Sequence, residues 1–255
     1  MHTTEQTRRG LSSFTLHCIA MVLMLGDHLW ATFLPQQDWL TCVGRLAFPI
    51  FAFLLAEGFW RTANLNKYMR RMLLFALASE IPFNLMVSRR IIQPFHQNVL
   101  WTFLLSLIAL SAVKKLETKG WVLRIAGTAL TALGFYVLGF VTFVDYYGYG
   151  ILMVMLFYLT RSGQDAPRSV RMGLMAVQLL GMYWINVEMM GGLVYPVTLL
   201  GWSFEFPRQG LALLALPILW LYDGRQGLHN PYTKWGCYLF YPVHLLILGG
   251  LLKLL

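Results

Sequence analysis

The chain has 255 residues, of which 58% are hydrophobic and only 12% are charged. A typical soluble domain carries about 25% charged residues, so this composition excludes an ordinary soluble protein. Long apolar runs recur along the chain, whereas the short alternating segments of a transmembrane β-barrel are absent. The sequence therefore predicts an all-α, polytopic integral membrane bundle of about 8–10 transmembrane helices, in a single domain over residues 1–255.

The first predicted span covers residues 11–34 and follows a polar stretch, residues 1–10, that we expect to be frayed. This span is too long for the apolar region of a cleaved signal peptide, so we expect it to be retained. Residues 190–222 contain two shorter apolar pieces, which glycine and proline residues interrupt. The remaining spans are predicted at 42–62, 67–87, 98–113, 121–142, 147–160, 170–187 and 234–254.

Basic residues cluster before the first predicted crossing and again after every second one, and the loops between have few, apart from Arg89 and Arg90. The first cluster is Arg8 and Arg9, and later clusters fall within 61–71, 114–124 and 161–171. Because Lys and Arg are enriched in cytoplasmic loops, this pattern predicts a multi-pass protein of the cell membrane with a cytoplasmic N-terminus. The net charge of +9 then reflects topology and contact with membrane lipids or phosphates, and we expect no nucleic-acid partner.

The first predicted span carries the ionisable residues Asp27 and His28 in its second half, and the second span carries Arg45 and Glu57. Such residues are costly in hydrocarbon unless they pair, line a cavity or take part in function. A short turn joins the two spans, so we expect them to be antiparallel neighbours. The four residues are therefore our candidate catalytic residues.

Asp27 and His28 are adjacent, so their side chains diverge by about 100° around the helix axis. We therefore expect Asp27 to pair with Arg45 and His28 to face a cavity, where a neutral imidazole is a good general base. The alternative is a structural ion pair beside a core histidine. Glu57 and Arg61 are four residues apart, so they form either part of the site or a structural helix pair.

Other polar residues form a second group of candidates. The last span carries tyrosines and a histidine on one face, which suits either a cavity wall or an interfacial aromatic belt. Basic residues at the expected cytoplasmic ends either hold phosphates or only set topology. No spacing of His or Cys suits a metal ion, so we expect no metal. The candidate cofactor-binding residues are Arg61, Arg70, Arg71, Tyr241 and His244, and the candidate substrate-binding residues are Asn98, Trp101 and Asp145.

Four sequence motifs resemble those of the TraX family. They are DH late in the first span, GRLAFPIFAFLLAEGF in the second, RRMLLFALASEIPFN in the third and YLFYPVHLLIL in the last. That family includes the membrane acetyltransferase that modifies the N-terminus of conjugative pilin, and it is similar to a wider superfamily of membrane acyltransferases. The resemblance implies that His28 takes the catalytic position, with Asp27 beside it and with Arg45 and Glu57 in the second-span motif.

The sequence and the resemblance together predict an integral membrane acyltransferase that uses acetyl-CoA or another acyl-CoA as donor. The expected acceptor is an amine or hydroxyl of a peptide, a pilin-like protein or a small molecule. His28 would act as general base, and Arg45, held by Asp27, would shape the site or stabilise the oxyanion. Two alternatives remain, a proton-coupled transporter that uses the same buried residues and a non-catalytic membrane scaffold.

Overall fold

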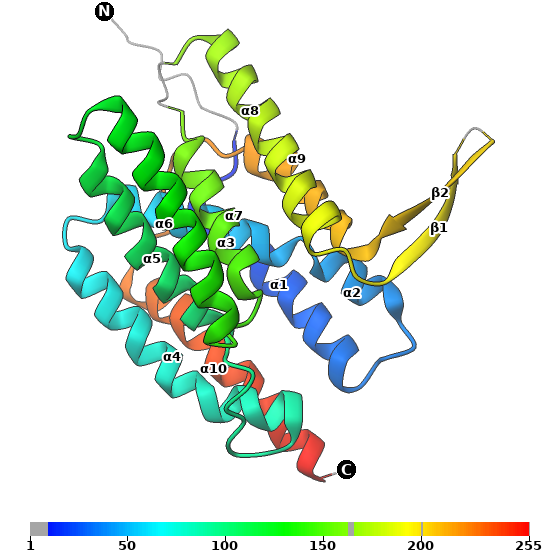
Figure 1. Ribbon diagram of the computed structural model, residues 1–255. Helices are drawn as coiled ribbons and strands as arrows, with labels where there is room; N and C mark the ends of the chain where they lie inside the picture. The colour runs from blue at the N-terminus through cyan, green and yellow to red at the C-terminus, as the bar shows by residue number, and fades with distance from the viewer. Residues whose placement is uncertain (1–9, 163–165, 200, 255) are drawn as a thin grey trace, which may run out of the picture.

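The computed structural model describes residues 10–162, 166–199 and 201–254, and its fold is a helical bundle (Figure 1). The expected frayed segment 1–10 therefore lies almost wholly outside the described residues. Six segments of the described chain are helical, long and apolar enough to cross a membrane, which confirms the predicted all-α polytopic class. These segments are α1 (Ser13–Thr32), α2 (Asp38–Gly44) with α3 (Ala47–Arg61), α4 (Leu65–Ser88), α5 (Val99–Leu116), α6 (Trp121–Val141) and α10 (Pro231–Leu254).

Shorter helices complete the bundle. The predicted sixth and seventh spans correspond to α7 (Tyr147–Leu159) and to α8 (Arg168–Tyr183), which continues into the π-helix η1 (Trp184–Met189). The 3₁₀-helix η2 (Arg208–Leu214) leads into α9 (Ala215–Trp220). Of these, α7 and the η2–α9 segment are shorter than a complete span needs, and the α8–η1 segment is not among the six segments that are long and apolar enough to cross a membrane.

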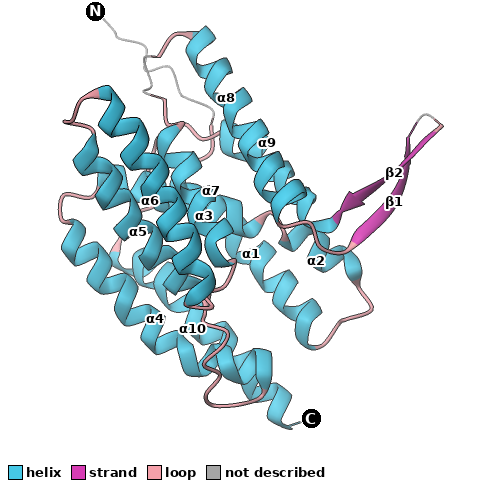
Figure 2. Cartoon of the chain, viewed as in Figure 1, coloured by secondary structure: helices cyan, strands magenta, loops and turns pink. Residues whose placement is uncertain are grey.

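The prediction of two apolar pieces over residues 190–222 was wrong for the first piece. The chain there forms an antiparallel hairpin of β1 (Val194–Leu199) and β2 (Trp202–Pro207), drawn in magenta in Figure 2. Gly201 at the turn has φ +85°, a conformation that glycine adopts without strain. Residues 202–207 alternate between large aromatic and other side chains, which is a strand period rather than a helix period.

The bundle has two distinct ends, because successive helices alternate in direction (Figure 1). At one end α1, α4 and α10 begin and α3 ends. We call it the basic end, because most of the arginine and lysine side chains lie there, including Arg61, Arg71 and Arg161. The opposite end carries the turn between α1 and α2 and the β-hairpin, and we call it the hairpin end.

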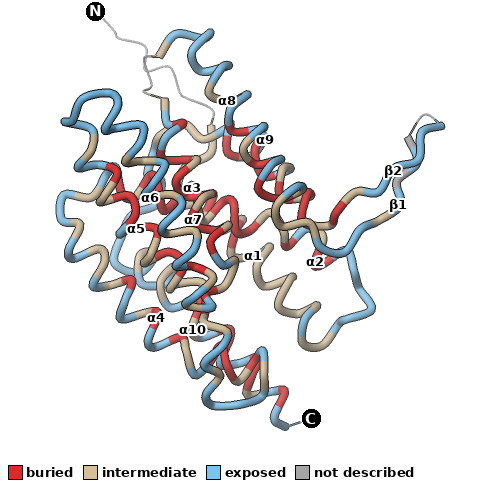
Figure 3. The backbone as a smooth tube through the Cα atoms, viewed as in Figure 1, coloured by how far each residue is buried: buried red, intermediate tan, exposed pale blue. Residues whose placement is uncertain are grey.

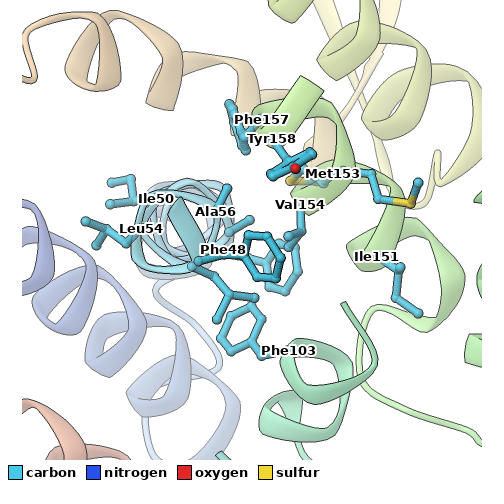
Figure 4. Packing of buried hydrophobic residues seen from close by; sticks show 14 of the residues in the cluster. Phe48, Ile50, Leu54, Ala56, Phe103, Ile151, Met153, Val154, Phe157 and Tyr158 are labelled. Atoms are coloured by element: carbon cyan, nitrogen blue, oxygen red, sulfur yellow. The ribbon is translucent and has the colours of Figure 1, made fainter. Parts of the chain in front are cut away.

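Helix α3 lies at the centre of the main hydrophobic core. Its buried side chains pack against those of α5 and α7, with Phe48, Phe103 and Phe157 among them (Figure 4). By contrast, large apolar side chains on α6 are exposed along its length, as the pale blue of Figure 3 shows. Apolar side chains on the outside of a helical bundle are what contact with lipid requires. Because α3 is central, Arg45, which lies just before its first residue, is also inside the bundle.

A smaller core holds α10 against α4. Phe83 and Met86 of α4 pack with Tyr241, Leu245 and Leu248 of α10, and side chains of α1 cover this cluster. This packing places the histidine of α10 beside the C-terminal half of α1.

Candidate active site

The predicted ion pair between the first two spans is present. Nη2 of Arg45 donates to both carboxylate oxygens of Asp27, at 2.5 and 2.6 Å. Arg45 lies in the break between α2 and α3, and the preceding Gly44 packs directly on Asp27. A Cβ atom at Gly44 would lie 2.5 Å from the Cβ of Asp27, so a glycine is needed for this close approach.

Arg45 makes further hydrogen bonds away from α1. Its Nε donates to the carbonyl of Thr41 at 3.3 Å, and its Nη1 donates to Oε1 of Gln209 in η2 at 3.4 Å. The guanidinium therefore joins α1, α2 and η2. Arg45 lines neither of the two cavities described below, so its geometry suits positioning of Asp27 better than direct contact with a substrate.

His28 has a partner that its sequence context does not reveal. Its Nδ1 lies 2.7 Å from Nε2 of His244 in α10, and the two rings are nearly parallel, with centroids 5.0 Å apart. Nδ1 of His244 lies 2.7 Å from the carbonyl oxygen of Phe240. The structure therefore places His244 against the candidate base rather than in the cofactor-binding position that we expected.

These contacts fix the tautomers of two neutral rings. A carbonyl oxygen only accepts hydrogen bonds, so Nδ1 of His244 carries the proton that binds Phe240. Nε2 of His244 is then the acceptor, and Nδ1 of His28 donates to it. Nε2 of His28 keeps its lone pair and makes no hydrogen bond within the described residues. A ring oriented in this way can accept a proton from a bound group.

A small cavity of about 60 Å³ adjoins His28. Its volume corresponds to about two water molecules at the roughly 30 Å³ that each occupies in the liquid, so only a small group fits. Asp27 and Asp145 contribute carboxylates to its wall, and both were candidate site residues. The other side chains around it are mainly apolar or aromatic, and they include Phe48, Val99, Phe103, Tyr146 and Tyr241.

Asn98 and Trp101, our other substrate-binding candidates, hold a neighbouring helix instead. Nδ2 of Asn98 donates to Oε2 of Glu80 at 2.5 Å and to the carbonyl of Ala76 at 2.9 Å, and Nε1 of Trp101 donates to the same Oε2 at 3.0 Å. Neither residue lines a cavity. Glu80 was not among our candidates. It is a lone carboxylate within a predicted span, and such a residue indicates a buried partner or a functional site.

Asp145 connects the small cavity to the surface loop before α5. Its Oδ1 accepts from the backbone N–H of Tyr146 at 3.1 Å and lies 3.7 Å from Nε2 of His96. The interaction with Asp145 is the main cause that raises the pKa of His96 above its usual value, and nearby Glu80 adds to this effect while partial burial opposes it. His96 was not among our candidates, since nothing in its local sequence indicates a carboxylate partner 49 positions away.

A larger cavity of about 490 Å³ extends inward from the basic end. Glu57 lies in its wall and accepts hydrogen bonds from Nε of Arg61 at 3.1 Å and from Nε of Arg161 at 2.7 Å. The structure therefore separates Glu57 from Asp27, His28 and Arg45. Twelve residues of helix correspond to about 18 Å at 1.5 Å per residue, which explains why Glu57 and Arg45 do not converge.

The candidate phosphate-binding arginines differ in position. Arg71 lines the large cavity and packs over the rings of Tyr68 and Tyr238, at 5.9 and 5.6 Å from their centroids. Its Nε is buried and has no hydrogen-bond partner within the described residues. Arg70 is exposed and lines neither cavity. Arg71 is therefore the better placed of the two to bind an anion.

The two cavities share part of their lining. Five side chains border both of them, and one is Tyr241, for which a cavity wall was one of the two alternatives that the sequence left open. A ligand that enters at the basic end could thus extend from the arginines toward His28. Within the described residues, no group of three or more His, Cys, Asp or Glu side chains is arranged to hold a metal ion. The shared residues are Met24, Phe51, Val99, Phe103 and Tyr241.

Comparison with known proteins gives the family. The family model described as "TraX protein" matches residues 12–252, nearly the whole chain. The chain belongs to the TraX family. A relative with the name "Probable fimbrial assembly protein FimC, serogroup H1", from Dichelobacter nodosus, is 28% identical over 253 residues, which cover 93% of this TraX-family chain and 94% of the relative. No solved structure matches.

Proposed function

We propose that this TraX-family protein is a membrane acyltransferase that moves an acetyl or other short acyl group from acyl-CoA to an amine or hydroxyl. The observation that carries this proposal is the position of His28: it lines a small cavity next to a large cavity with a basic mouth, and its Nδ1 lies 2.7 Å from Nε2 of His244, which leaves its own Nε2 free to accept a proton. The name of the relative favours a pilin or another peptide N-terminus as acceptor.

The large cavity suits the donor. Arg71 offers a buried Nε that lacks a partner, and Arg61 and Lys234 add positive charge at the same mouth. Arginine binds phosphate through charge-assisted hydrogen bonds, so these residues would hold the phosphates of CoA. Deeper in the cavity, side chains such as Leu54 and Phe75 would contact the acyl-bearing arm. The basic end would face the cytoplasm, where acyl-CoA is made, by the positive-inside rule.

In the proposed reaction, His28 accepts a proton from the acceptor at Nε2 as the acceptor nitrogen or oxygen attacks the thioester carbonyl carbon. The new C–N or C–O bond forms, the C–S bond breaks, and the thiolate of CoA leaves. His28 then returns its proton to the thiolate, so that the ring is neutral again. His244 accepts from Nδ1 of His28 throughout and stabilises the imidazolium form, while Asp27 contributes negative charge beside the small cavity.

Acyl transfer from labelled acetyl-CoA to an amine-bearing peptide tests the proposal. His28→Gln should lower transfer by at least about 10²-fold, the lower end of what a positioned general base contributes. CoA binding and the melting temperature should stay close to those of the wild type. His17→Gln is the comparison on the same helix: His17 lines only the large cavity, so its loss could alter acyl-CoA binding but should leave the rate at saturating acyl-CoA unchanged. Transfer at the wild-type rate by His28→Gln would show that His28 is structural.

A proton-coupled transporter is the second candidate. The series of ionisable side chains from His28 through Asp145 to His96 favours it, because such a series can carry protons between a cavity and the surface. Uptake of a solute into proteoliposomes, driven by a pH gradient and independent of CoA, would support transport. The basic mouth and the unpartnered Nε of Arg71 favour the acyltransferase instead.

A further inference from the structure

The β-hairpin has two chemically different faces. Its register pairs Tyr195 with Phe206, and Phe204 and Trp202 follow on the same face because alternate residues of a strand share a face. On the opposite face Thr198 pairs with Ser203, and their hydroxyl oxygens lie 3.0 Å apart. The pair of Pro196 and Glu205 belongs to that face as well. One face is thus aromatic, and the other is polar toward the turn.

The aromatic face is packed on the bundle at its base and exposed toward its turn. The thiol of Cys42 in α2 lies 3.9 Å from the hydroxyl of Tyr195, and Phe206 contacts Gly210 so closely that a Cβ there would lie 2.6 Å from the ring. Further along, Phe204 is 46% exposed and Trp202 is 80% exposed. The described part of the bundle therefore leaves Trp202 largely uncovered and Phe204 about half uncovered, although the base of the same face is anchored.

The position of the hairpin indicates what covers these side chains. It extends sideways from the bundle and runs across the direction of the long helices (Figures 1 and 2). Other tryptophans lie at the same end, where Arg208 stacks on Trp30 at 5.0 Å and Trp39 and Trp184 are each 61% exposed. Exposed tryptophans at an end of a membrane bundle are typical of the headgroup region.

We infer that the hairpin lies in the headgroup layer at the hairpin end, with its aromatic face against lipid acyl chains. An element that runs across the spans, at the level of the interfacial tryptophans, lies parallel to the membrane surface. Trp202 and Phe204 then lose contact with water, while Thr198, Ser203 and Glu205 remain in contact with it. At a lipid surface the aromatic face contacts acyl chains while the polar face contacts water and headgroups. A protein partner on the aromatic face would have to displace lipid.

Spin-label accessibility in lipid bilayers tests this assignment. Labels are placed at Trp202→Cys, Ser203→Cys, Phe204→Cys and Glu205→Cys, one at a time, after Cys18, Cys42 and Cys237 have been replaced by serine. Relaxation by oxygen should exceed that by a water-soluble nickel chelate at 202 and 204, and the order should reverse at 203 and 205. The residues at 203 and 205 are the matched controls, because they lie on the same strand with the opposite orientation.

A second measurement keeps the native side chains in place. The fluorescence contributed by Trp202 is the difference between the wild type and Trp202→Phe, since the chain has nine tryptophans. Lipids brominated near the headgroup should quench this contribution more strongly than lipids brominated at the chain ends. Equal access of the nickel chelate to all four labelled positions, or a Trp202 signal that neither lipid quenches, would overturn the inference and leave the aromatic face free for a protein partner.

Discussion

Ion pairs between a carboxylate and arginine lie near both cavities. The two groups differ in how exposed their side chains are and in the volume of the cavity beside them. Around the small cavity, Asp27 and Arg45 have side chains only 21% and 19% exposed, and each has fixed partners. At the large cavity, Glu57 is 10% exposed while Arg61 and Arg161 are 42% and 34% exposed. A fixed ion pair with little exposure beside a volume of about two waters suits chemistry on a small group, whereas more exposed arginines near a large volume suit binding of an anion.

The largest effect on stability should follow from breaking the buried pair. Asp27→Asn leaves Arg45 without its counter-charge, and loss of one partner of a buried pair typically costs about 3–5 kcal/mol. We expect a value toward the lower end, because both side chains are partly exposed. Thermal melts should show this loss, and the double variant Asp27→Asn with Arg45→Gln should recover stability without activity. A double variant no more stable than the single one would contradict the pairing.

A smaller loss, of activity alone, is expected when the ring behind His28 is removed. His244→Leu leaves Nδ1 of His28 without an acceptor, so the inactive tautomer becomes available, and transfer should fall on the order of tenfold or more. His244→Gln retains a side-chain oxygen that can accept from Nδ1, so it should recover part of the rate. The KM for acyl-CoA should stay unchanged in both variants. Equal loss with Leu and Gln would indicate that His244 only packs.

Variants of Arg70 and Arg71 should show which of these two neighbouring residues binds CoA and which only contributes to membrane topology. Arg71→Gln removes a charged donor from the large cavity and should weaken CoA binding about tenfold, since a hydrogen bond to a charged group contributes about 1.5–3 kcal/mol. Arg70→Gln is the matched control and should bind CoA as the wild type does, because Arg70 is exposed outside both cavities. Titrations with CoA and with desphospho-CoA in detergent measure this difference, and equal weakening by both variants would remove the special role of Arg71.

The smallest effect concerns pH and the loop before α5. The pKa of His96 is raised in the folded protein, so the protonated ring stabilises the fold below the unfolded pKa of about 6.5, and this contribution disappears as pH rises through the folded pKa. His96→Gln should therefore lower the melting temperature slightly at pH 5–6 and leave it unchanged at pH 8. His229→Gln, an exposed histidine at the basic end, is the control. A loss that is equal at both pH values would exclude the ion pair with Asp145.

Sequence reasoning succeeded where the partners lie close together in the chain. Asp27 and Arg45 were predicted to pair because a short turn joins two antiparallel spans, and helix geometry alone sends His28 in another direction. His28 and His244 are 216 positions apart, and their contact depends on which helices become neighbours in the bundle. Hydropathy periodicity carries no information about that choice, so the pair could not be found from the sequence.

Two other expectations differ from what the structure shows, for different physical reasons. Asn98 and Trp101 were interpreted as substrate-binding residues because they are hydrogen-bonding groups at the start of a span. In the structure both donate to the carboxylate of Glu80 in α4. Residues 190–222 were expected to form two shorter apolar pieces within an all-α bundle, whereas residues 194–207 form a β-hairpin. The alternation of Trp202, Phe204 and Phe206 with Ser203 and Glu205 was visible, and it is a strand pattern.

During synthesis, α1 and the α2–α3 segment enter the membrane long before α10. A charged residue opposes insertion of an isolated helix, by about 2.5–3.5 kcal/mol when it lies at the helix centre and by less toward an end, so Asp27 and Arg45 should enter as a neutralised pair. His28 meets its partner only when the ribosome has added some 216 further residues. The nascent protein would therefore be assembled and anchored first, and the base would acquire its orientation when α10 inserts beside α1 and α4.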